Sequence, residues 1–285
     1  MKIIVTHYSP YVDAVTSVWL LKRFLEGWNE AEVKFVAAGT TLEGGVVDSD
    51  SDIWHVDTGM GLLDHHQTDE DTCASKRVME YITKKIRNQK SEIRNPFPDE
   101  ALERMVDVVN DIDHFRESSY PNATNDIYDF GMVGIMDGWK LLYGDDHLKM
   151  IQLGMLVLDG IYRKFQDKIW AEKEISEKGI PFKTKWGKGI AVETVNDEIV
   201  RLAQKMGYVV AARKDPKKGY VRIKALPDSK ADLTTCLNKL KNLDKNATWF
   251  LHASRKMVLN GSIKNPLTVP TNLTLREIVN VLRKK

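Results

Sequence analysis

Imidazole and carboxylate side chains recur in the first third of this chain at points where short apolar segments end. The densest group is Asp64-His65-His66, and Asp57 lies shortly before it. Far upstream, His7 ends the first apolar run and Asp13 follows it. Oxygen and imidazole ligands together favour Mn²⁺, with Mg²⁺, Fe²⁺, Co²⁺ and Zn²⁺ as alternatives. The pattern predicts a divalent-metal centre.

Each of these side chains, taken singly, also has a structural explanation. Asp13 lies at a predicted helix start, where aspartate commonly caps backbone N–H groups. Asp57 precedes a threonine and a glycine, and aspartate beside glycine is common in turns. Together, however, these residues fall at the carboxyl ends of predicted strands or in the segments that follow, where α/β sheets place their sites. Asp111 and Asp113 follow a predicted helix that ends near Val109, and Asp111 belongs to the same group.

Strands and helices alternate through the first part of the chain. Apolar runs predict strands over residues 2–7, 33–38, 53–57 and 61–63. Apolar residues at helical spacing predict helices over 13–26, 74–88 and from 98 or 99 to 109. The alternation implies an α/β fold with a largely parallel sheet and helices on both faces. A long helical connector is expected over 131–177, interrupted at 143–146.

A turn-rich break at 178–181 precedes a different pattern, which predicts a smaller C-terminal α/β domain. Its expected elements are a strand at 189–195, a helix at 197–206, a hairpin of 208–213 and 220–225, a helix at 232–243 and a strand at 248–252. The chain is therefore expected to form a metal-binding catalytic domain with its helical connector, 1–172, and a basic substrate-binding domain, 182–285.

Charge is divided unequally between these two parts. Residues 182–285 contain 22 Lys and Arg against 8 Asp and Glu, a net charge of +14, so the rest of the chain has a net charge of −12. An acidic part that holds cations beside a basic part that holds phosphates suits an enzyme acting on a polyanion. The alternative is that solvated helix faces happen to differ in sign.

Composition limits the class of protein. Hydrophobic residues make up 42% and charged residues 29%, as in ordinary globular proteins. No apolar run is long enough for a membrane span, and the first residues resemble a strand more than a secretory signal. Cys73 and Cys236 have no neighbouring cysteine, which predicts free thiols and a cytoplasmic location and excludes a zinc finger.

Four segments, in order, resemble the motifs of the DHH phosphoesterase superfamily. They are Thr6-His7-x-x-Pro10-x-x-Asp13-Ala14, Val56-Asp57-x-Gly59, Asp64-His65-His66-Gln67 and Asn110-Asp111-Ile112-Asp113-His114-Phe115. The superfamily includes RecJ-type exonucleases, nanoRNases and family II inorganic pyrophosphatases. The Asp-His-His-Gln form, together with Phe250-Leu251-His252-Ala253-Ser254, is similar to the melanocyte-proliferating-gene type of DHH nuclease.

The resemblance implies roles for individual residues. Asp57 would bridge two ions of Mn²⁺ or Mg²⁺, and His7 would serve one of them. The other ion would be held by Asp13, His65 and Asp111, with Asp113 as the competitor of Asp111. Asp64 would orient a neighbouring imidazole, and His66 would contact the phosphate or the leaving oxygen. In the second domain, the residues at phosphate-binding positions are His252, Ser254, Arg255, Asn260 and Gly261.

One position departs from the family pattern. The first motif normally carries His-x-x-x-Asp-x-Asp, and Tyr11 stands where the first of those aspartates is expected. A neutral phenol, with a pKa of about 10, is a poor metal ligand. The set of ligands expected with His7 therefore lacks one carboxylate. The choice between one and two ions per chain stays open.

The expected function is divalent-metal-dependent phosphoester hydrolysis, with a 3′–5′ exonuclease or an oligonucleotide-degrading hydrolase as first choice. Its substrate would be single-stranded or short nucleic acid, or a nucleotide. One alternative is a small-molecule phosphatase or phosphodiesterase acting on pyrophosphate, 3′-phosphoadenosine phosphate or cyclic dinucleotides. The other is a catalytically reduced nucleic-acid-binding protein.

Overall fold

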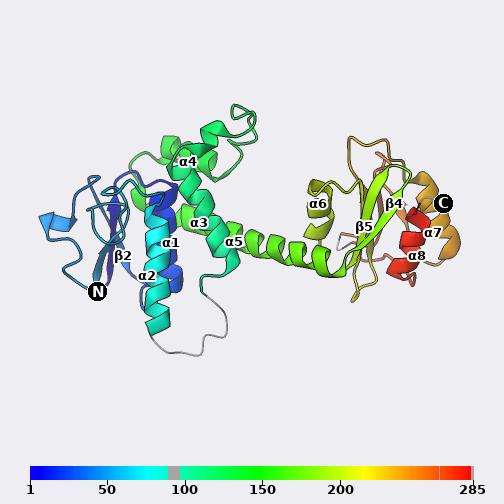
Figure 1. Ribbon diagram of the computed structural model, residues 1–285, viewed down its shortest axis with the longest axis horizontal. Helices are drawn as coiled ribbons and strands as arrows, with labels where there is room; N and C mark the ends of the chain where they lie inside the picture. The colour runs from blue at the N-terminus through cyan, green and yellow to red at the C-terminus, as the bar shows by residue number, and fades with distance from the viewer. Residues whose placement is uncertain (89–96, 263, 284–285) are drawn as a thin grey trace. The chain divides into compact units, whose positions relative to one another are not determined.

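The computed structural model describes residues 1–88, 97–262 and 264–283. The chain divides into two compact units, Met1–Phe165 and Gln166–Lys285, called unit 1 and unit 2 below. The division falls within α5 (His147–Lys178), the long helix in Figure 1. The functional division between 1–172 and 182–285 stays a prediction. None of the described helices is long and apolar enough to cross a membrane.

Unit 1 contains a parallel three-stranded sheet in the order β2-β1-β3. Its strands are β1 (Ile3–His7), β2 (Glu32–Val36) and β3 (Ile53–His55). Strand β1 is central, and the register pairs Val5 with Lys34 on one side and with His55 on the other. Because parallel strands run in one direction, the ends of β1 and β3 lie at the same edge of the sheet. This confirms the α/β class and the parallel pairing.

The helices of unit 1 pack around α1. They are α1 (Val12–Phe24), α2 (Ala74–Asn88), α3 (Glu100–Asp113), α4 (Met132–Tyr143) and the 3₁₀ turns η1 (Leu42–Gly44) and η2 (Arg116–Ser119). Helix α1 contacts both α2 and α3, and Val15 and Trp19 belong to the buried core. Helix α2 has the predicted bounds. Helix α3 extends beyond the predicted end at Val109, because apolar residues at helical spacing continue to Ile112.

Unit 2 is built on a mixed six-stranded sheet in the order β4-β5-β6-β7-β9-β8. Its strands are β4 (Ile180–Thr184), β5 (Gly187–Glu193), β6 (Val210–Lys214), β7 (Val221–Ala225), β8 (Phe250–Leu251) and β9 (Met257–Asn260). Only the β5–β6 pair is parallel, and β6 and β7 form the predicted hairpin. The C-terminal part is therefore α/β, as predicted.

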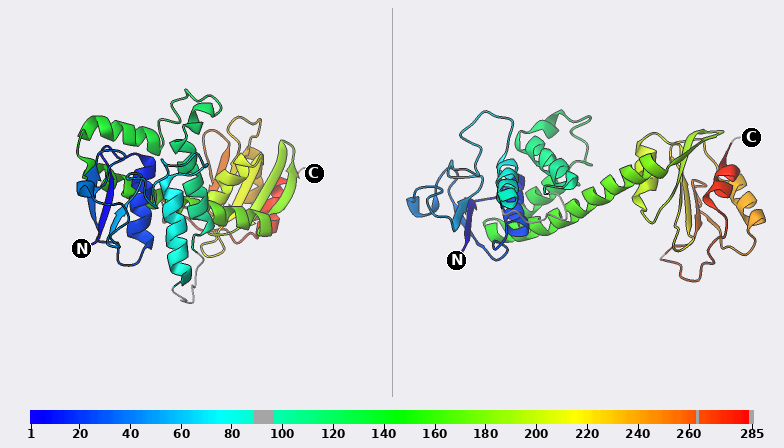
Figure 2. Two further views of the ribbon diagram at one scale, coloured as in Figure 1. Left: turned by 60° about the vertical axis from the view of Figure 1, so that its left-hand side comes forward. Right: turned by 60° about the horizontal axis from the view of Figure 1, so that its bottom comes forward.

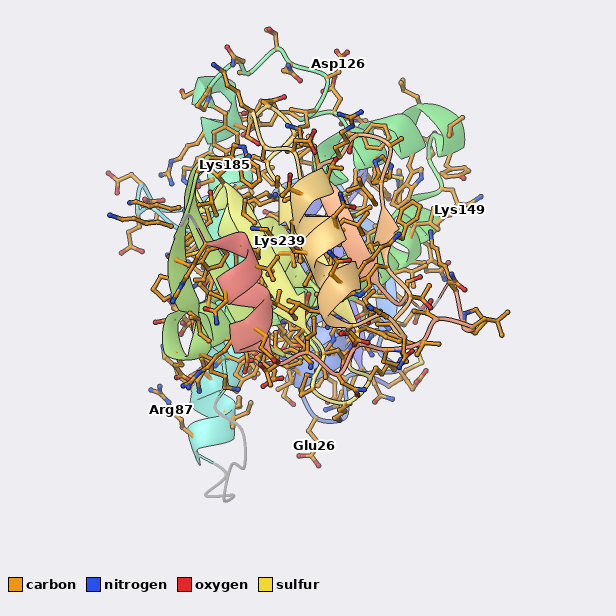
Figure 3. All side chains as sticks on the ribbon, turned by 90° about the vertical axis from the view of Figure 1, so that its right-hand side faces the viewer. Glu26, Arg87, Asp126, Lys149, Lys185 and Lys239 are labelled. Atoms are coloured by element: carbon orange, nitrogen blue, oxygen red, sulfur yellow. The ribbon has the colours of Figure 1, made fainter. Side chains whose placement is uncertain are left out.

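Helices cover both faces of the unit 2 sheet, as Figures 1 and 2 show. They are α6 (Glu198–Lys205), α7 (Thr234–Leu243) and α8 (Leu275–Leu282). Successive side chains of β6 point to opposite faces of the sheet and belong to two different cores. Ala211 packs with α6 and the end of α5, whereas Val210 and Ala212 pack with α7 and α8. This alternation is the period of two that a strand requires. Helices α7 and α8 face the viewer in Figure 3.

Three elements of unit 2 were not expected from the sequence: β4, β9 and α8. The predicted break at 178–181 is in fact the end of α5 followed by β4. Pro181 makes that segment look like a turn, but β4 is an edge strand, where a missing N–H is tolerated. Strand β9 becomes evident only through its pairing with β7.

Candidate metal centre

The carboxyl edge of the unit 1 sheet gathers the predicted imidazole and carboxylate residues. His7 is the last residue of β1, and Asp57 follows β3 by two residues. Asp13 lies in the first turn of α1, which begins shortly after β1. An isolated parallel bridge between Val56 and Leu63 brings the segment after Leu63 to the same edge. Residues far apart in sequence therefore meet where two neighbouring strands end.

Asp57 lies at the middle of the cluster and is 6% exposed. Its backbone has a left-handed conformation, φ 55°, which aspartate adopts more readily than most residues. Its Oδ2 lies 3.1 Å from His7 Nε2, and its Oδ1 lies 3.4 Å from His65 Nε2. Burial alone would raise the pKa of Asp57, but the adjacent imidazoles of His65 and His7 hold it below its usual value.

His7 is oriented as metal-binding histidines are. Its Nδ1 lies 2.8 Å from the backbone carbonyl of Tyr8, which can only accept, so Nδ1 carries a proton. Its Nε2 is thereby directed at Asp57, and loss of the Nε2 proton would leave a lone pair there for a cation. Burial lowers the pKa of His7, but the carboxylate of Asp57 outweighs it and the pKa lies above its usual value. Metal-ligating histidines typically donate their second N–H to a carbonyl in this way.

His65 is surrounded by three carboxylates. Its Nε2 lies 3.4 Å from Asp57 Oδ1, 3.5 Å from Asp113 Oδ2 and 4.0 Å from Asp13 Oδ2. Asp57 is the main cause that raises the pKa of His65 to about 9, against the opposing effect of burial. A proton on this imidazole therefore supplies positive charge where the carboxylates converge.

Asp13 joins the cluster to α2. Its Oδ2 and Oδ1 accept hydrogen bonds from the backbone N–H groups of Ala74 and Ser75, at 2.7 and 2.9 Å. These are the first residues of α2, whose N–H groups have no partner within the helix. Burial, followed by the charges of Asp57 and Asp113, raises the pKa of Asp13 to about 7. Three neighbouring carboxylates thus cannot all stay charged without a compensating cation.

Asp64 is fully buried and positions the two histidines that follow it. Its Oδ2 accepts from the backbone N–H of Met60 at 2.7 Å, and its Oδ1 accepts from the N–H of His65 at 2.7 Å. His66 Nδ1 also lies 2.7 Å from Asp64 Oδ1. The His66 side chain is 55% exposed, and its Nδ1 lies 3.9 Å from Asp57. Asp64 therefore fixes the imidazole of His66 at the exposed side of the cluster.

Asp113, not Asp111, is the α3 carboxylate that lies next to His65. Asp111 Oδ1 instead forms an ion pair with Arg116 at 2.9 Å, and Arg116 also binds Asp71. Side chains two residues apart on a helix differ in direction by about 200°. Asp111 and Asp113 therefore cannot serve the same site. Burial raises the pKa of Asp113, and the charge of His65 opposes that effect.

Once α3 is known to continue to Asp113, its helical register places Asp113 on the same face as the buried residues. The buried stripe runs through Leu102, Met105, Val106 and Val109, and a residue four positions after Val109 continues it. The extrapolation requires that the helix continue past Val109, which the sequence pattern did not predict. Asp113 was recognised only as the competitor of Asp111.

Tyr11 takes no part in the cluster. It precedes α1 in extended conformation and makes no side-chain capping bond. Burial, followed by the charges of Asp137 and Glu117, raises the pKa of its phenol to about 12. The phenol is therefore neutral at any physiological pH, and nothing in the described cluster replaces the carboxylate expected at that position.

The cluster fits a divalent cation. Two atoms that each bind one ion at about 2.1 Å lie roughly 3 to 4 Å apart, and the nitrogen–oxygen distances around Asp57 and His65 run from 3.1 to 4.0 Å. Asp57 Oδ1 and His65 Nε2 are buried and make no hydrogen bond within the described part of the chain. Buried polar atoms without partners are rare in proteins, so these two atoms have the environment of metal ligands.

The five residues expected to bind phosphate in unit 2 do not form one site. His252 and Ser254 lie in the exposed turn between β8 and β9, where His252 Nδ1 is 2.8 Å from Ser254 Oγ. In the same turn Arg255 pairs with Asp232 at 3.2 Å. Asn260 is fully buried, and its amide binds backbone groups of neighbouring loops. Gly261 follows it at the other end of β9.

Comparison with known proteins gave matches among solved structures alone. No family model and no curated protein matches the chain. One match is a DHH-domain protein described as belonging to a family of ribosomal proteins, with 10% identity and a TM-score of 0.32 over 99% of this chain and 85% of that one. Another is RecJ in complex with Mg²⁺ from Thermus thermophilus, with 11% identity and a TM-score of 0.30 over 99% of this chain and 49% of that one.

Both matches are to DHH-type proteins, the superfamily that the four sequence motifs resemble. Similarity at this level carries no argument about activity, so the proposals below depend on the residues and geometry of this chain. What the structure itself provides is a parallel sheet whose carboxyl edge gathers three carboxylates around His65, at 3.4 to 4.0 Å, with His7 3.1 Å from one of them, Asp57.

Proposed function

We propose that this protein is a divalent-metal-dependent phosphoesterase, and specifically a 3′–5′ exonuclease or an oligonucleotide-degrading hydrolase. The observation that carries the proposal is the pair of buried atoms Asp57 Oδ1 and His65 Nε2, which lie 3.4 Å apart at the centre of a carboxylate–imidazole cluster and form no hydrogen bond within the described residues. The order and spacing of the four DHH-like motifs support phosphoester hydrolysis as the chemistry, and the basic unit 2 supports a polyanionic substrate.

Five side chains of unit 1 would hold Mn²⁺ or Mg²⁺: His7, Asp13, Asp57, His65 and Asp113. Asp113 here takes the place that the resemblance gave to Asp111. When bound, such an ion polarises a phosphoryl oxygen and lowers the pKa of a coordinated water. Asp57 has one oxygen toward His7 and the other toward His65, so its carboxylate is suited to bridge two ions.

His66 and Asp64 would serve the substrate rather than the ion. Asp64 accepts from His66 Nδ1, so the other ring nitrogen is left to meet a phosphate or a leaving oxygen at the exposed side of the cluster. Asp64 acts through His66 and through the backbone of the 60–66 loop, so it is a positioning residue. In unit 2, the exposed turn with His252, Ser254 and Arg255 would add contacts to the nucleic acid.

The proposal is tested with Mn²⁺, Mg²⁺ or chelator and end-labelled RNA and DNA of several lengths. Mononucleotide release that requires the metal and is lost in Asp57→Asn is the expected result; asparagine keeps the left-handed backbone conformation and removes the charge. Lys239→Ala on α7 is the matched control and should behave as the natural protein. Equal rates for Asp57→Asn and the natural protein on every substrate would refute the assignment.

The same assay distinguishes the small-molecule alternative. Pyrophosphate, 3′-phosphoadenosine phosphate and cyclic dinucleotides are compared with oligonucleotides at equal phosphate concentration. A preference for oligonucleotides is expected, because a net charge of +14 in residues 182–285 exceeds what a small anion requires. Faster turnover of a small phosphoester would assign the protein to that class instead.

Tyr11 is the one observation that favours a second function, nucleic-acid binding with reduced catalysis. Its neutral phenol stands where a carboxylate is expected, and its charged neighbours Asp137 and Glu117 are outside the cluster. That function predicts tight, salt-sensitive oligonucleotide binding without metal-stimulated turnover. Elemental analysis of protein purified without chelator, together with the turnover panel, decides between the two functions.

A further inference from the structure

Unit 2 contains a basic cavity of about 520 Å³ at the end of its sheet opposite to the His252 turn. The cavity is lined by residues from the end of β6, the start of β7 and the segment after β9. The His252 turn lies at the other end of β7, where the Ala225 N–H donates to the Lys256 carbonyl. The two places are therefore separate. Of the residues that the resemblance implied for phosphate binding, His252, Ser254 and Arg255 lie in the turn, whereas Gly261 lines the cavity.

A buried arginine forms one wall of the cavity. Arg213 is 6% exposed, its Nε lies 2.8 Å from Asp197 Oδ1, and its Nη1 donates to the Thr194 carbonyl at 3.0 Å. Its Nη2 has no hydrogen-bond partner within residues 1–88, 97–262 and 264–283, and it is not among the fully covered polar atoms. Nη1 is held by the Thr194 carbonyl, and Nε is paired with Asp197 without forming a hydrogen bond within the described residues. Nη2 is therefore left as a donor at the cavity wall.

Lysines surround this arginine, and the nearby carboxylates are already engaged. Lys217, Lys218 and Lys264 line the cavity, and no ion pair of their ammonium groups occurs among the described residues. Asp215 Oδ1 accepts from the backbone N–H groups of Lys217 and Lys218, at 2.8 and 2.9 Å. That carboxylate shapes the hairpin tip instead of neutralising the lysines.

The second lining carboxylate is shared between two arginines. Asp197 pairs with Arg213 at 2.8 Å and with Arg222 at 2.9 Å, and Arg222 is opposite Arg213 in the β6–β7 register. Five cationic side chains thus face two carboxylates that are both occupied. The three lysines without an ion pair among the described residues, together with the remaining donor of Arg213, favour an anion with several oxygens.

Beside the cations the cavity has an apolar wall. This wall is formed by Tyr220 together with Val195 and Val221. Gly261 has φ +86°, and a Cβ at that position would lie 2.1 Å from the Tyr220 ring. Glycine is therefore required for the backbone after β9 to approach the ring, and this approach helps to fix the ring at the cavity.

From this arrangement we propose that the cavity is a nucleotide-binding site in unit 2: its lysines and Arg213 bind the phosphates, and the Tyr220 ring contacts the nucleoside. The volume lies within the range of small-molecule sites. The cavity is lined by residues of unit 2 alone, and its occupation requires no divalent ion. The assignment therefore stands or falls independently of the proposed hydrolysis.

The test measures binding by the full chain in the presence of chelator, which excludes metal-dependent turnover. Calorimetry at two salt concentrations uses ADP, inorganic pyrophosphate and adenosine as probes. ADP is expected to bind more tightly than pyrophosphate, because the ring adds contact, and adenosine is expected to bind weakly or not at all. Lys217→Ala/Lys218→Ala should weaken ADP binding by at least about tenfold, since each lysine contributes a charged contact.

Matched variants distinguish specific binding of ADP in the cavity from non-specific electrostatic attraction by surface lysines. Lys239→Ala/Lys241→Ala removes the same charge from exposed positions on α7, where Figure 3 labels Lys239, and should leave ADP binding within about twofold. Tyr220→Leu keeps an apolar contact and should weaken ADP binding about tenfold while leaving pyrophosphate binding unchanged. Equal losses in the two lysine pairs, no ADP binding, or no effect of Tyr220→Leu would each overturn the proposal.

Discussion

Replacing Asp113 by asparagine should weaken metal binding, whereas the same change at Asp111, two residues away, should not. The Asp113 carboxylate lies 3.5 Å from His65 Nε2. An ion bound to His65 would take the place of the proton on Nε2 and would therefore lie beside this carboxylate. Two unit charges at this separation interact by about 1 kcal/mol in bulk water and about 5 kcal/mol at the effective dielectric constant of protein sites. The Asp113 side chain is 23% exposed, so its contribution falls between these limits.

We therefore expect Asp113→Asn to weaken Mn²⁺ binding by about 3 kcal/mol, or roughly 100-fold. Asp111→Asn breaks a half-exposed ion pair with Arg116, which costs at most about 1 kcal/mol of folding stability, and should leave Mn²⁺ affinity unchanged. Calorimetric titration with Mn²⁺ and urea unfolding measure the two quantities.

A second readout uses the metal-free protein. The charge of Asp113 contributes to the raised pKa of His65, after the larger effect of Asp57. Removing that carboxylate should therefore lower the pKa of His65 from its value of about 9, as followed by NMR titration of the imidazole, and Asp111→Asn should leave it unchanged. If the two variants lose the same affinity, or if Asp111→Asn loses more, the placement of α3 in the site is wrong.

Three further predictions concern the loop, the missing carboxylate and the thiols. Asp64→Ala should lower the free energy of unfolding by about 2–4 kcal/mol, because buried N–H groups and the His66 ring lose their acceptor; a urea midpoint close to that of the natural protein would contradict this. Tyr11→Asp should raise the number of Mn²⁺ ions per chain in elemental analysis, and a natural protein that already holds two ions would make this position irrelevant. Cys73 and Cys236 should react slowly with a thiol reagent in the native state and rapidly in urea, because burial raises the pKa of both thiols, that of Cys236 to about 12; fast labelling of either thiol in the native protein would show that its segment opens.

The sequence was informative wherever a local pattern decides the structure. Apolar spacing located α1 and gave the bounds of α2, because a helix that buries one face must repeat its apolar residues every three or four positions. The order of strands and helices gave the α/β class, and β-branched residues marked β1 as a strand, whose central position only the structure shows. The polar residues after these strands could be grouped because the ends of parallel strands share an edge.

The sequence did not predict which distant segments pair as strands. Strands β4 and β9 are short, and their bounds depend on the partners that supply their hydrogen bonds. The basic hairpin tip at Lys217 and Lys218 has the sequence of a solvated loop, and only its position beside Arg213 and Tyr220 makes it part of a cavity. Asn260, expected to bind phosphate, is instead buried by loops that the sequence does not place.

The sequence by itself identified the candidate metal ligands, because Asp and His side chains at strand ends supply hard oxygen and imidazole groups. The tertiary structure decided which of them meet. Helix α3 continues past Val109, and its turn of about 100° per residue directs Asp113 to His65 and Asp111 to Arg116. Side chains that bind the same ion must point to one place within a few ångströms. Their directions are fixed by packing against the rest of the core rather than by neighbours in sequence.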